Sequence, residues 1–345
     1  MPKIEVVDMK KEVNVISERL LRGIENNLKN NNQTLIFINK RGYAPLIICK
    51  NCAYSKICEK CNTSLVLHNY RKPNKSYLLC HHCNYKEFFV NICPKCNTKE
   101  SFTFPGFGIE KIYEEIKKLF PKAKTCLLSS DSIKDINNFK TTISDITANK
   151  INIILGTQLI SKGHNFPSLK TVGILNIDNI INDFDFRSFE KTFQQVVQVS
   201  GRAGRKKLKG DVIIQTLQPQ HPIIRLCQKQ DIYDFMKWEL KSRMENQQPP
   251  YVNYISLIFS SKTEKFVSNF ASKTTELIKN NFKQLSIFGP APAILYRKNL
   301  YFRYRLLIKI EKSGQSQNKI KSFLMQIKIP NYIKLYIDVD PINFI

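Results

Sequence analysis

The chain has 345 residues, of which 42% are hydrophobic and 11% aromatic. This composition excludes a disordered protein, and the length allows two or three folded domains. Lys and Arg number 54 against 28 Asp and Glu, which gives a formal net charge of +26. Such an excess favours a polyanionic partner, above all nucleic acid, while a merely solvated basic surface remains the alternative.

The first residues, MPKIEVVDMKKE, lack the apolar segment of a secretion signal, and no apolar run reaches the length of a membrane span. We therefore expect a cytoplasmic protein without a membrane segment. In a reducing cytosol, paired cysteines bind metal more often than they form disulfides.

The first two thirds of the chain alternate between strand and helix patterns. A helical pattern occupies residues 11–30, and the short apolar run Thr34–Ile38 is typical of a buried parallel strand. A second helix is expected after Gly108 and ends before Pro121. Further buried strands are predicted at Ile151–Leu155, Val172–Ile177 and Val212–Gln215. This alternation predicts a parallel α/β layer built from residues 1–48 and 97–220.

A Cys-rich insert, residues 49–96, interrupts this layer. Eight of the ten cysteines form four CxxC pairs: Cys49/Cys52, Cys58/Cys61, Cys80/Cys83 and Cys93/Cys96. Each pair offers two thiolates to one tetrahedral Zn²⁺, so four pairs predict two Cys₄ zinc sites. A redox dithiol would instead need a single CxxC near the start of a βαβ unit.

The sequence between the pairs indicates how they combine. Two short strand-like segments, TSLVLHN and KSYLLC, flank the turn RKPNK. This pattern predicts a hairpin. The hairpin would bring Cys58/Cys61 beside Cys80/Cys83 and leave Cys49/Cys52 to share the second metal with Cys93/Cys96. We expect this nested arrangement rather than a sequential one. His81 and His82 are then surface residues, and the isolated Cys126 and Cys227 belong to the core.

Two further segments have features of a phosphate site. GTQLISKGHNFP (156–167) follows the strand-like INIIL, and α/β sheets place ligands at the carboxyl ends of parallel strands. QVSGRAGR (198–205) carries two arginines, each directly after a glycine, and the planar guanidinium suits phosphate oxygens. Together they favour a phosphate site over an ordinary polar loop. The sequence contains neither GxxxxGK[ST] nor an Asp-Glu dipeptide.

After QPQHP (218–222) the pattern changes to a helical segment around Trp238, the loop QQPPY, a helix near 264–282 and basic strand-like runs. The run Tyr296–Lys312 alternates, with Arg303, Arg305 and Lys309 on one face. Such a strand can follow a phosphate backbone, although any half-buried strand with a solvated basic face alternates in the same way.

Five segments in this order resemble the PriA family (primosomal protein N′) of bacterial replication-restart helicases. They are NKRGYAPLIICKNC, the four CxxC pairs, GTQLISKGHNFP, DFDFRSFEKTFQQVVQVSGRAGR and GPAPA. The resemblance covers essentially the whole chain but only the C-terminal half of that family's protein. It implies the second RecA-like lobe of a superfamily-2 helicase with an inserted two-zinc module. It also implies a C-terminal α+β domain, residues 221–345, that associates with DNA forks.

The resemblance also implies roles for single residues. Arg205 and Arg202 would act as arginine fingers on the γ-phosphate of ATP, supported by Gln198. Gly163 and Asn165 would lie near the nucleotide, although Asn165 stands where the family usually has Asp. The residues expected to contact DNA are Thr157, Lys162, Arg303 and Arg305.

In such motors ATP lies between two lobes, and the first lobe holds the phosphates and Mg²⁺. We therefore expect this chain to use ATP and Mg²⁺ only together with a first lobe that another chain supplies. Alone, the chain should be inactive. A non-catalytic zinc-containing module that binds DNA or protein is the alternative, and a zinc protein of RNA metabolism would leave the two phosphate segments unexplained. By resemblance, the partners are forked or single-stranded DNA, primosome proteins and single-strand-binding protein.

Overall fold

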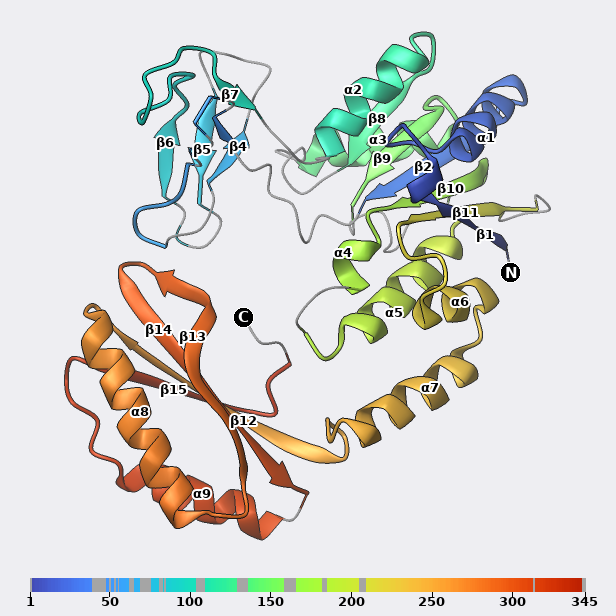
Figure 1. Cartoon of the computed structure of the whole chain (residues 1–345). Coiled ribbons are helices and arrows are strands. Elements are labelled where there is room, and N and C mark those ends of the chain that lie inside the picture. The colour runs from blue at the N-terminus through green and yellow to red at the C-terminus, as the bar shows by residue number, and fades with distance from the viewer. Residues whose placement is uncertain are drawn as a thin grey trace. The chain divides into compact units, whose positions relative to one another are not determined.

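The computed structural model describes residues 2–38, 48–49, 51–52, 54, 56–61, 65–68, 76–80, 83, 85–103, 109–128, 136–157, 166–181, 185–204, 209–312 and 314–342. The chain forms two compact units (Figure 1). Unit 1 contains Met1–Tyr43 and Phe107–Glu239, and unit 2 contains Ala44–Gly106 and Leu240–Ile345. The division into three domains stays a prediction. Within the described ranges, no helix is both long and apolar enough to cross a membrane.

Unit 1 is built on a six-stranded sheet with the order β1-β11-β10-β2-β9-β8, in which every pairing is parallel. Its strands are β1 (Lys3–Asp8), β2 (Gln33–Ile38), β8 (Thr125–Leu128), β9 (Ile153–Gly156), β10 (Leu169–Leu175) and β11 (Asp211–Thr216). The predicted parallel layer is confirmed. Strands β2 and β9 are buried along their whole length, as their uninterrupted apolar runs indicated. The sequence did not reveal β1, because its charged residues break the apolar run.

Helices cover both faces of this sheet (Figure 1). Apolar residues of α1 (Glu18–Lys29) and α2 (Ile109–Leu119) pack in one core, and those of α3 (Ile136–Thr147), α5 (Ser188–Ser200) and α6 (Pro222–Lys229) pack in the other. The other helices that the structure describes in unit 1 are η1 (Met9–Lys11), α4 (Asp178–Ile181) and the first part of α7 (Ile232–Glu245). The boundary between the two units falls within α7.

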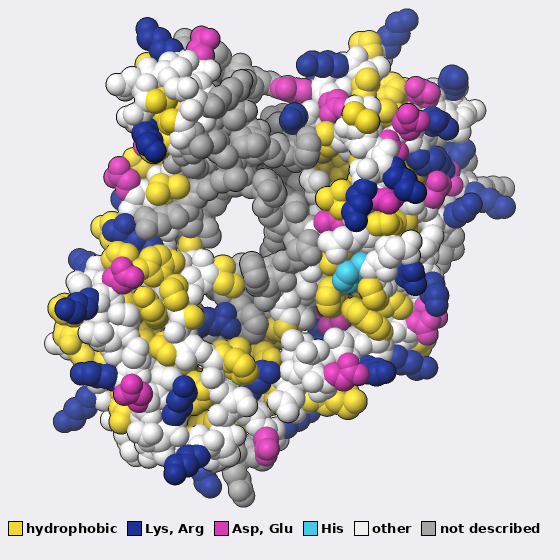
Figure 2. All heavy atoms as spheres, in the orientation of Figure 1, with side chains coloured by type: hydrophobic (Ala, Val, Ile, Leu, Met, Phe, Trp, Pro, Cys, Tyr) yellow, Lys and Arg dark blue, Asp and Glu magenta, His cyan; other side chains and the backbone are white. Residues whose placement is uncertain are grey.

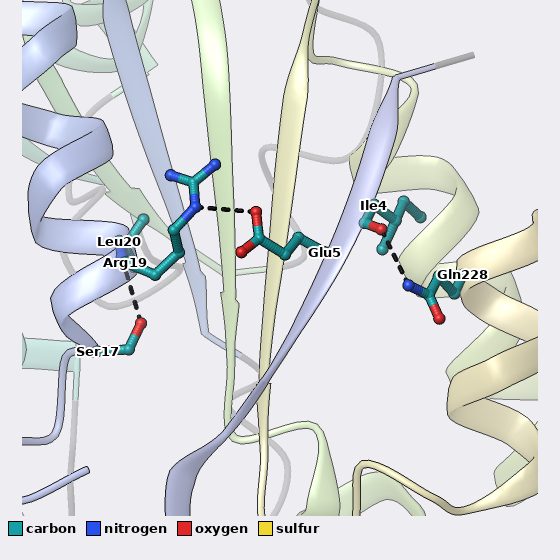
Figure 3. A network of polar contacts seen from close by, with 6 residues as sticks. All are labelled: Ile4, Glu5, Ser17, Arg19, Leu20 and Gln228. Carbon is teal, nitrogen blue, oxygen red and sulfur yellow. Dashed lines mark hydrogen bonds and ion pairs between the residues drawn. The ribbon is translucent and has the colours of Figure 1, made fainter. Parts of the chain in front are cut away.

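The N-terminal strand β1 is held from both sides (Figure 3). Arg19 of α1 forms an ion pair with Glu5 at 2.8 Å, and the Gln228 amide of α6 donates to the Ile4 carbonyl at 3.3 Å. Helix α1 begins later than the predicted helical pattern because the Ser17 hydroxyl accepts from the Leu20 N–H and caps the helix there. The bond between Gln228 and Ile4 joins residues 224 positions apart, so periodicity alone could not reveal it.

The C-terminal part of unit 2 has β-α-β-β-α-β topology. Its elements are β12 (Val252–Ser261), α8 (Glu264–Asn281), β13 (Ser286–Lys298), β14 (Tyr301–Glu311), α9 (Gly314–Gln326) and β15 (Lys334–Val339). The antiparallel sheet has the order β13-β14-β12-β15, and α8 and α9 pack on one face of it. The strand-like run Tyr296–Lys312 is not one strand. It contains a turn at Asn299 and Leu300, whose positive φ angles reverse the chain.

The Cys-rich part of unit 2 contains two small antiparallel sheets. Strand β3 (Ile48–Cys49) pairs with β7 (Phe102–Thr103), and β4 (Val66–His68), β5 (Tyr77–Leu79) and β6 (Lys86–Phe88) form a three-stranded sheet. The predicted hairpin corresponds to β4 and β5, and its turn lies outside the described residues, as do His81 and His82. The core consists of cysteines and a few large apolar side chains such as Leu78 and Phe102. So little apolar surface suggests that metal binding helps to hold this part together.

Candidate functional site

The eight paired cysteines gather into two clusters. The outer cluster is Cys49, Cys52, Cys93 and Cys96, and the inner cluster is Cys58, Cys61, Cys80 and Cys83. Within each cluster all four sulfur atoms lie within 4.8 Å of one another. This grouping is the nested one, because β4 and β5 bring the inner pairs together and leave the outer pairs to meet.

The spacing of the sulfur atoms fits a tetrahedral metal ion. The Sγ atoms of Cys58 and Cys83 are 3.6 Å apart, as are those of Cys49 and Cys96. A disulfide would require about 2.05 Å. Four thiolates around a metal ion at about 2.3 Å place neighbouring sulfurs about 3.8 Å apart. Each cluster can therefore hold one metal ion.

Different groups surround the two clusters. In the outer cluster, the Thr98 hydroxyl lies 3.2 Å from the Cys96 sulfur and lowers the pKa of that thiol to about 5. The Ser101 side chain likewise lowers the pKa of Cys49. In the inner cluster, burial raises the pKa of Cys58 to about 12 and that of Cys61 to about 11. Nearby hydroxyls thus favour the thiolates of Cys96 and Cys49 in the outer cluster, whereas burial opposes those of Cys58 and Cys61 in the inner one.

In unit 1 the structure describes three of the residues expected to contact ATP or DNA. Gln198 is exposed on α5, Arg202 is half-buried in the turn after that helix, and Thr157 is buried directly after β9. The other expected residues, Lys162, Gly163, Asn165 and Arg205, lie outside the described residues.

The turn that carries Arg202 is firmly placed against the sheet. Gly204 has φ +72°, a left-handed conformation that favours glycine, and its N–H donates to the Leu169 carbonyl at 2.9 Å. A side chain at Gly210 would bring its Cβ within 2.6 Å of the Ala203 and Gly204 backbone. Both glycines are therefore needed for the turn to pack at the start of β10.

The parallel strands separate the two ends of GTQLISKGHNFP. Thr157 follows the carboxyl end of β9, whereas Phe166 leads into Leu169 at the amino end of β10. The Gly201–Gly204 turn therefore lies at the amino edge of the sheet, opposite Thr157. The two described ends of this motif therefore lie at opposite edges of the sheet.

Asp185 positions the helix that leads to this turn. Its carboxylate accepts from the Arg187 N–H at 3.0 Å and forms an ion pair with Lys191 on the first turn of α5. The Asp185 side chain is 8% exposed, so water screens this pair little. Sequence reasoning did not single out Asp185, although an acidic residue just before a helix is a recognisable signal.

In unit 2, Arg303 and Arg305 lie on the sheet face without helices. The alternating residues Tyr304, Leu306 and Ile308 pack on the opposite, helix-covered face. Arg303 donates to the Leu295 carbonyl at 3.3 Å, and burial lowers the pKa of both guanidinium groups. These side chains are thus partly held by the sheet and are half-buried.

Other groups on this sheet set the surroundings of the two arginines. Lys309 donates to the Asn246 carbonyl at 3.1 Å, so the loop after α7 covers that end of the face. On the edge strand β13, Phe288 and Ile294 are 50% and 55% exposed. Figure 2 shows hydrophobic side chains gathered over the β13–β14 hairpin and Lys and Arg side chains spread over both units. The basic face is therefore bordered by apolar side chains.

Comparison with known proteins accounts for both units. A family model described as primosomal protein N C-terminal domain matches residues 244–342, and one described as helicase conserved C-terminal domain matches residues 96–207. Replication restart protein PriA of Rickettsia conorii is 37% identical over 100% of this chain and 53% of its own length. The Bacillus subtilis protein of that name is 33% identical over 99% of the chain and 43% of its own length. The chain belongs to the PriA family. It spans about half the length of these PriA relatives.

The two family matches fall on the features described above. The helicase match includes Thr157, Gln198 and Arg202, and the PriA C-terminal match includes Arg303 and Arg305. Among solved structures, S. cerevisiae Dbp5 bound to RNA and ADP BeF3 aligns with 70% of this chain and 45% of the Dbp5 chain, at 12% identity and a TM-score of 0.34.

Proposed function

We propose that the chain acts as the C-terminal half of a PriA-type, ATP-dependent DNA helicase in the cytoplasm, in replication restart and primosome assembly at stalled forks. The observation that carries this proposal is the match of essentially the whole chain to relatives named replication restart protein PriA, at 31% to 38% identity. Forked or single-stranded DNA, primosome proteins and single-strand-binding protein are the proposed partners.

In this proposal unit 1 supplies one side of an ATP site. Arg202 and Arg205 stabilise charge on the γ-phosphate, Gln198 supports them, and Gly163 and Asn165 lie near the nucleotide. The contact of the Gly201–Gly204 turn with β10 supports this role, because a finger must be held in place to act in the transition state. The phosphate loop and Mg²⁺ ligands come from a first lobe outside this sequence.

The same proposal assigns one Zn²⁺ to each cysteine cluster. Thiolate-only tetrahedral sites suit zinc, and sulfur separations of 3.6 Å fit the zinc–sulfur bond length. Four protein ligands leave no open position, so the role of both ions is structural. Binding of structural zinc contributes on the order of 10 kcal/mol to the folding of such small modules.

Two separate surfaces contact DNA in this proposal. Thr157 and Lys162 lie on the DNA side of unit 1, and Arg303 and Arg305 provide a contact on the helix-free face of unit 2. An open sheet face that carries cations and aromatic rings is a common platform for single strands. The contact that fixes Arg303 on Leu295 supports this role, because a pre-positioned cation loses less entropy on binding.

The ATP site is tested by reconstitution. The chain alone should show no DNA-stimulated ATP hydrolysis, and addition of a PriA first-lobe polypeptide should restore it. Arg205→Ala should then lower the turnover number by roughly 10³- to 10⁵-fold. Arg225→Ala, at an exposed arginine of α6, is the matched control and should leave turnover unchanged. A reconstituted pair that never hydrolyses ATP would favour the alternative, a non-catalytic zinc-containing module that binds DNA or protein.

The DNA contact is tested by the salt dependence of binding. Binding to forked DNA should weaken by about 0.9 log units per log unit of salt for each phosphate neutralised. Replacing Arg303 and Arg305 by Gln should weaken binding and reduce that slope. The control, Lys273→Gln with Lys279→Gln on α8, removes the same charge from the opposite face. Equal effects of the two double variants would mean that only net charge matters.

A further inference from the structure

The tip of the β13–β14 hairpin contacts the first knuckle of the inner cysteine cluster. The Leu300 N–H donates to the Lys60 carbonyl at 3.0 Å, and the Arg297 guanidinium donates to the Glu59 carbonyl at 2.9 Å. Two groups at the tip of this hairpin therefore reach the four-residue knuckle between Cys58 and Cys61, from about 240 positions further along the chain.

The conformation of the turn is specialised for this contact. Asn299 and Leu300 have φ angles of +50° and +69°, and they join Lys298 and Tyr301, which pair across the hairpin. Two successive positive φ angles define a type I′ turn, in which Asn-Gly is favoured. Asn tolerates the left-handed region, but Leu does not, and a residue held there costs roughly 1–3 kcal/mol. The contacts with the knuckle offset this cost.

The outer cluster obtains comparable contacts from its own neighbourhood. Thr98, which touches the Cys96 sulfur, lies only two residues from that cysteine. For the inner cluster, the contacts from Leu300 and Arg297 come instead from the C-terminal sheet. Hydrogen bonds to thiolates remove negative charge from sulfur and orient it for the metal.

We infer that the Asn299–Leu300 turn, together with Arg297, forms an outer coordination shell for the metal of the inner cluster, so that this metal anchors the β13–β14 hairpin. The inference rests on the zinc assignment proposed above. Loss of such outer contacts typically weakens metal binding by about 10- to 100-fold. Because coupling is reciprocal, removal of the metal should loosen the hairpin by the same factor.

The coupling reaches the basic face directly. Strand β14 starts at Tyr301, immediately after the turn, and Arg303 is its third residue. Metal bound by residues near position 60 therefore helps to position a strand near position 300.

The test measures each cysteine separately in the full chain. Zinc-loaded protein is mixed with a thiol-alkylating reagent and a chelator, and the labelling rate of every cysteine is followed by peptide mass spectrometry. Leu300→Pro removes the N–H and cannot adopt a positive φ. Arg297→Ala removes the second contact and leaves the backbone intact. Leu300→Gly keeps both the N–H and the turn, and is the matched control.

We expect the inner-cluster cysteines to react about 10- to 100-fold faster in Leu300→Pro, and several-fold faster in Arg297→Ala, than in the parent or Leu300→Gly. The outer-cluster cysteines should keep the parent rate in all variants. Unchanged inner-cluster rates in Arg297→Ala, the variant that preserves the backbone, would overturn the inference whether or not Leu300→Pro folds. Rapid labelling of every cysteine in the zinc-loaded parent would instead refute the zinc assignment itself.

Hydrogen exchange supplies the converse measurement. Chelation in the parent should accelerate exchange of amides near the turn, residues 296–303, while amides of α8 in the same sheet-and-helix module keep their rate. No acceleration in 296–303 after confirmed loss of both metal ions would also overturn the inference.

Discussion

Gly173 on β10 lies beneath Leu20 of α1, and we expect Gly173→Ala to destabilise unit 1. In the register of the sheet Gly173 stands between Ile36 of β2 and Ile213 of β11, and all these neighbours belong to one core. A Cβ at Gly173 would lie 2.6 Å and 3.0 Å from the two methyl carbons of Leu20. Carbon atoms normally approach only to about 3.5–4.0 Å, so Leu20 would have to retreat by roughly 1 Å.

The retreat is costly because Leu20 is completely buried. Protein interiors leave no empty space for such a shift, and overpacking of this kind costs about 1–3 kcal/mol. Leu20→Ala alone should cost about 2–5 kcal/mol through the cavity that it leaves. In the double variant, the atoms that clash are absent and the new methyl fills part of the cavity. The double variant should therefore be no less stable than Leu20→Ala alone.

Gly23→Ala, on the same helix as Leu20, is the matched control for Gly173→Ala. Its Cβ would lie 3.5 Å from Thr171 and 3.7 Å from Ile213, which are ordinary contacts. Because Ala favours a helix over Gly by about 1 kcal/mol, this variant should be more stable than the parent.

Urea unfolding followed by fluorescence measures all four variants. The chain has a single tryptophan, Trp238, which packs against Phe189 in unit 1 and so reports on that unit. Additive losses in the double variant, or a Gly173→Ala protein as stable as the parent, would refute the packing argument.

Three further outcomes follow from the same structure. Asn27→Ala removes a buried amide that donates to the Thr34 and Thr171 hydroxyls at 2.9 Å and 2.7 Å, and it should lower the free energy of unfolding by about 1–3 kcal/mol in urea titrations. Burial lowers the pKa of His221, whose Nδ1 accepts from the Ile223 N–H. The folded state therefore binds this proton less readily, and stability should fall as pH drops below about 6.5. His221→Asn keeps the cap and should remove that part of the pH dependence of the melting temperature. Chelation of both metal ions should unfold the Cys-rich part, seen as loss of hydrogen-exchange protection there, while Trp238 fluorescence stays unchanged.

Much of this protein is determined by local sequence. The CxxC spacing and the short hairpin between the inner pairs indicate the cysteine grouping, because residues near in sequence must meet when a tight turn joins them. The strands β2, β9 and β11 are visible as apolar runs, since a strand buried on both faces has no polar alternation. The motifs of the second helicase lobe are likewise readable, because each is a continuous segment.

Tertiary structure decides the features that depend on contacts between distant residues. The sequence does not show that the Gly204 N–H donates to the Leu169 carbonyl. It therefore cannot place the Gly201–Gly204 turn at the amino edge of the sheet. It reads Tyr296–Lys312 as one strand, because apolar alternation continues through a turn that only backbone dihedral angles reveal. The contact of Leu300 with Lys60 joins positions 240 apart, and its hydrogen bond involves backbone groups. Backbone groups are the same in every residue, so no side-chain pattern can encode where they meet.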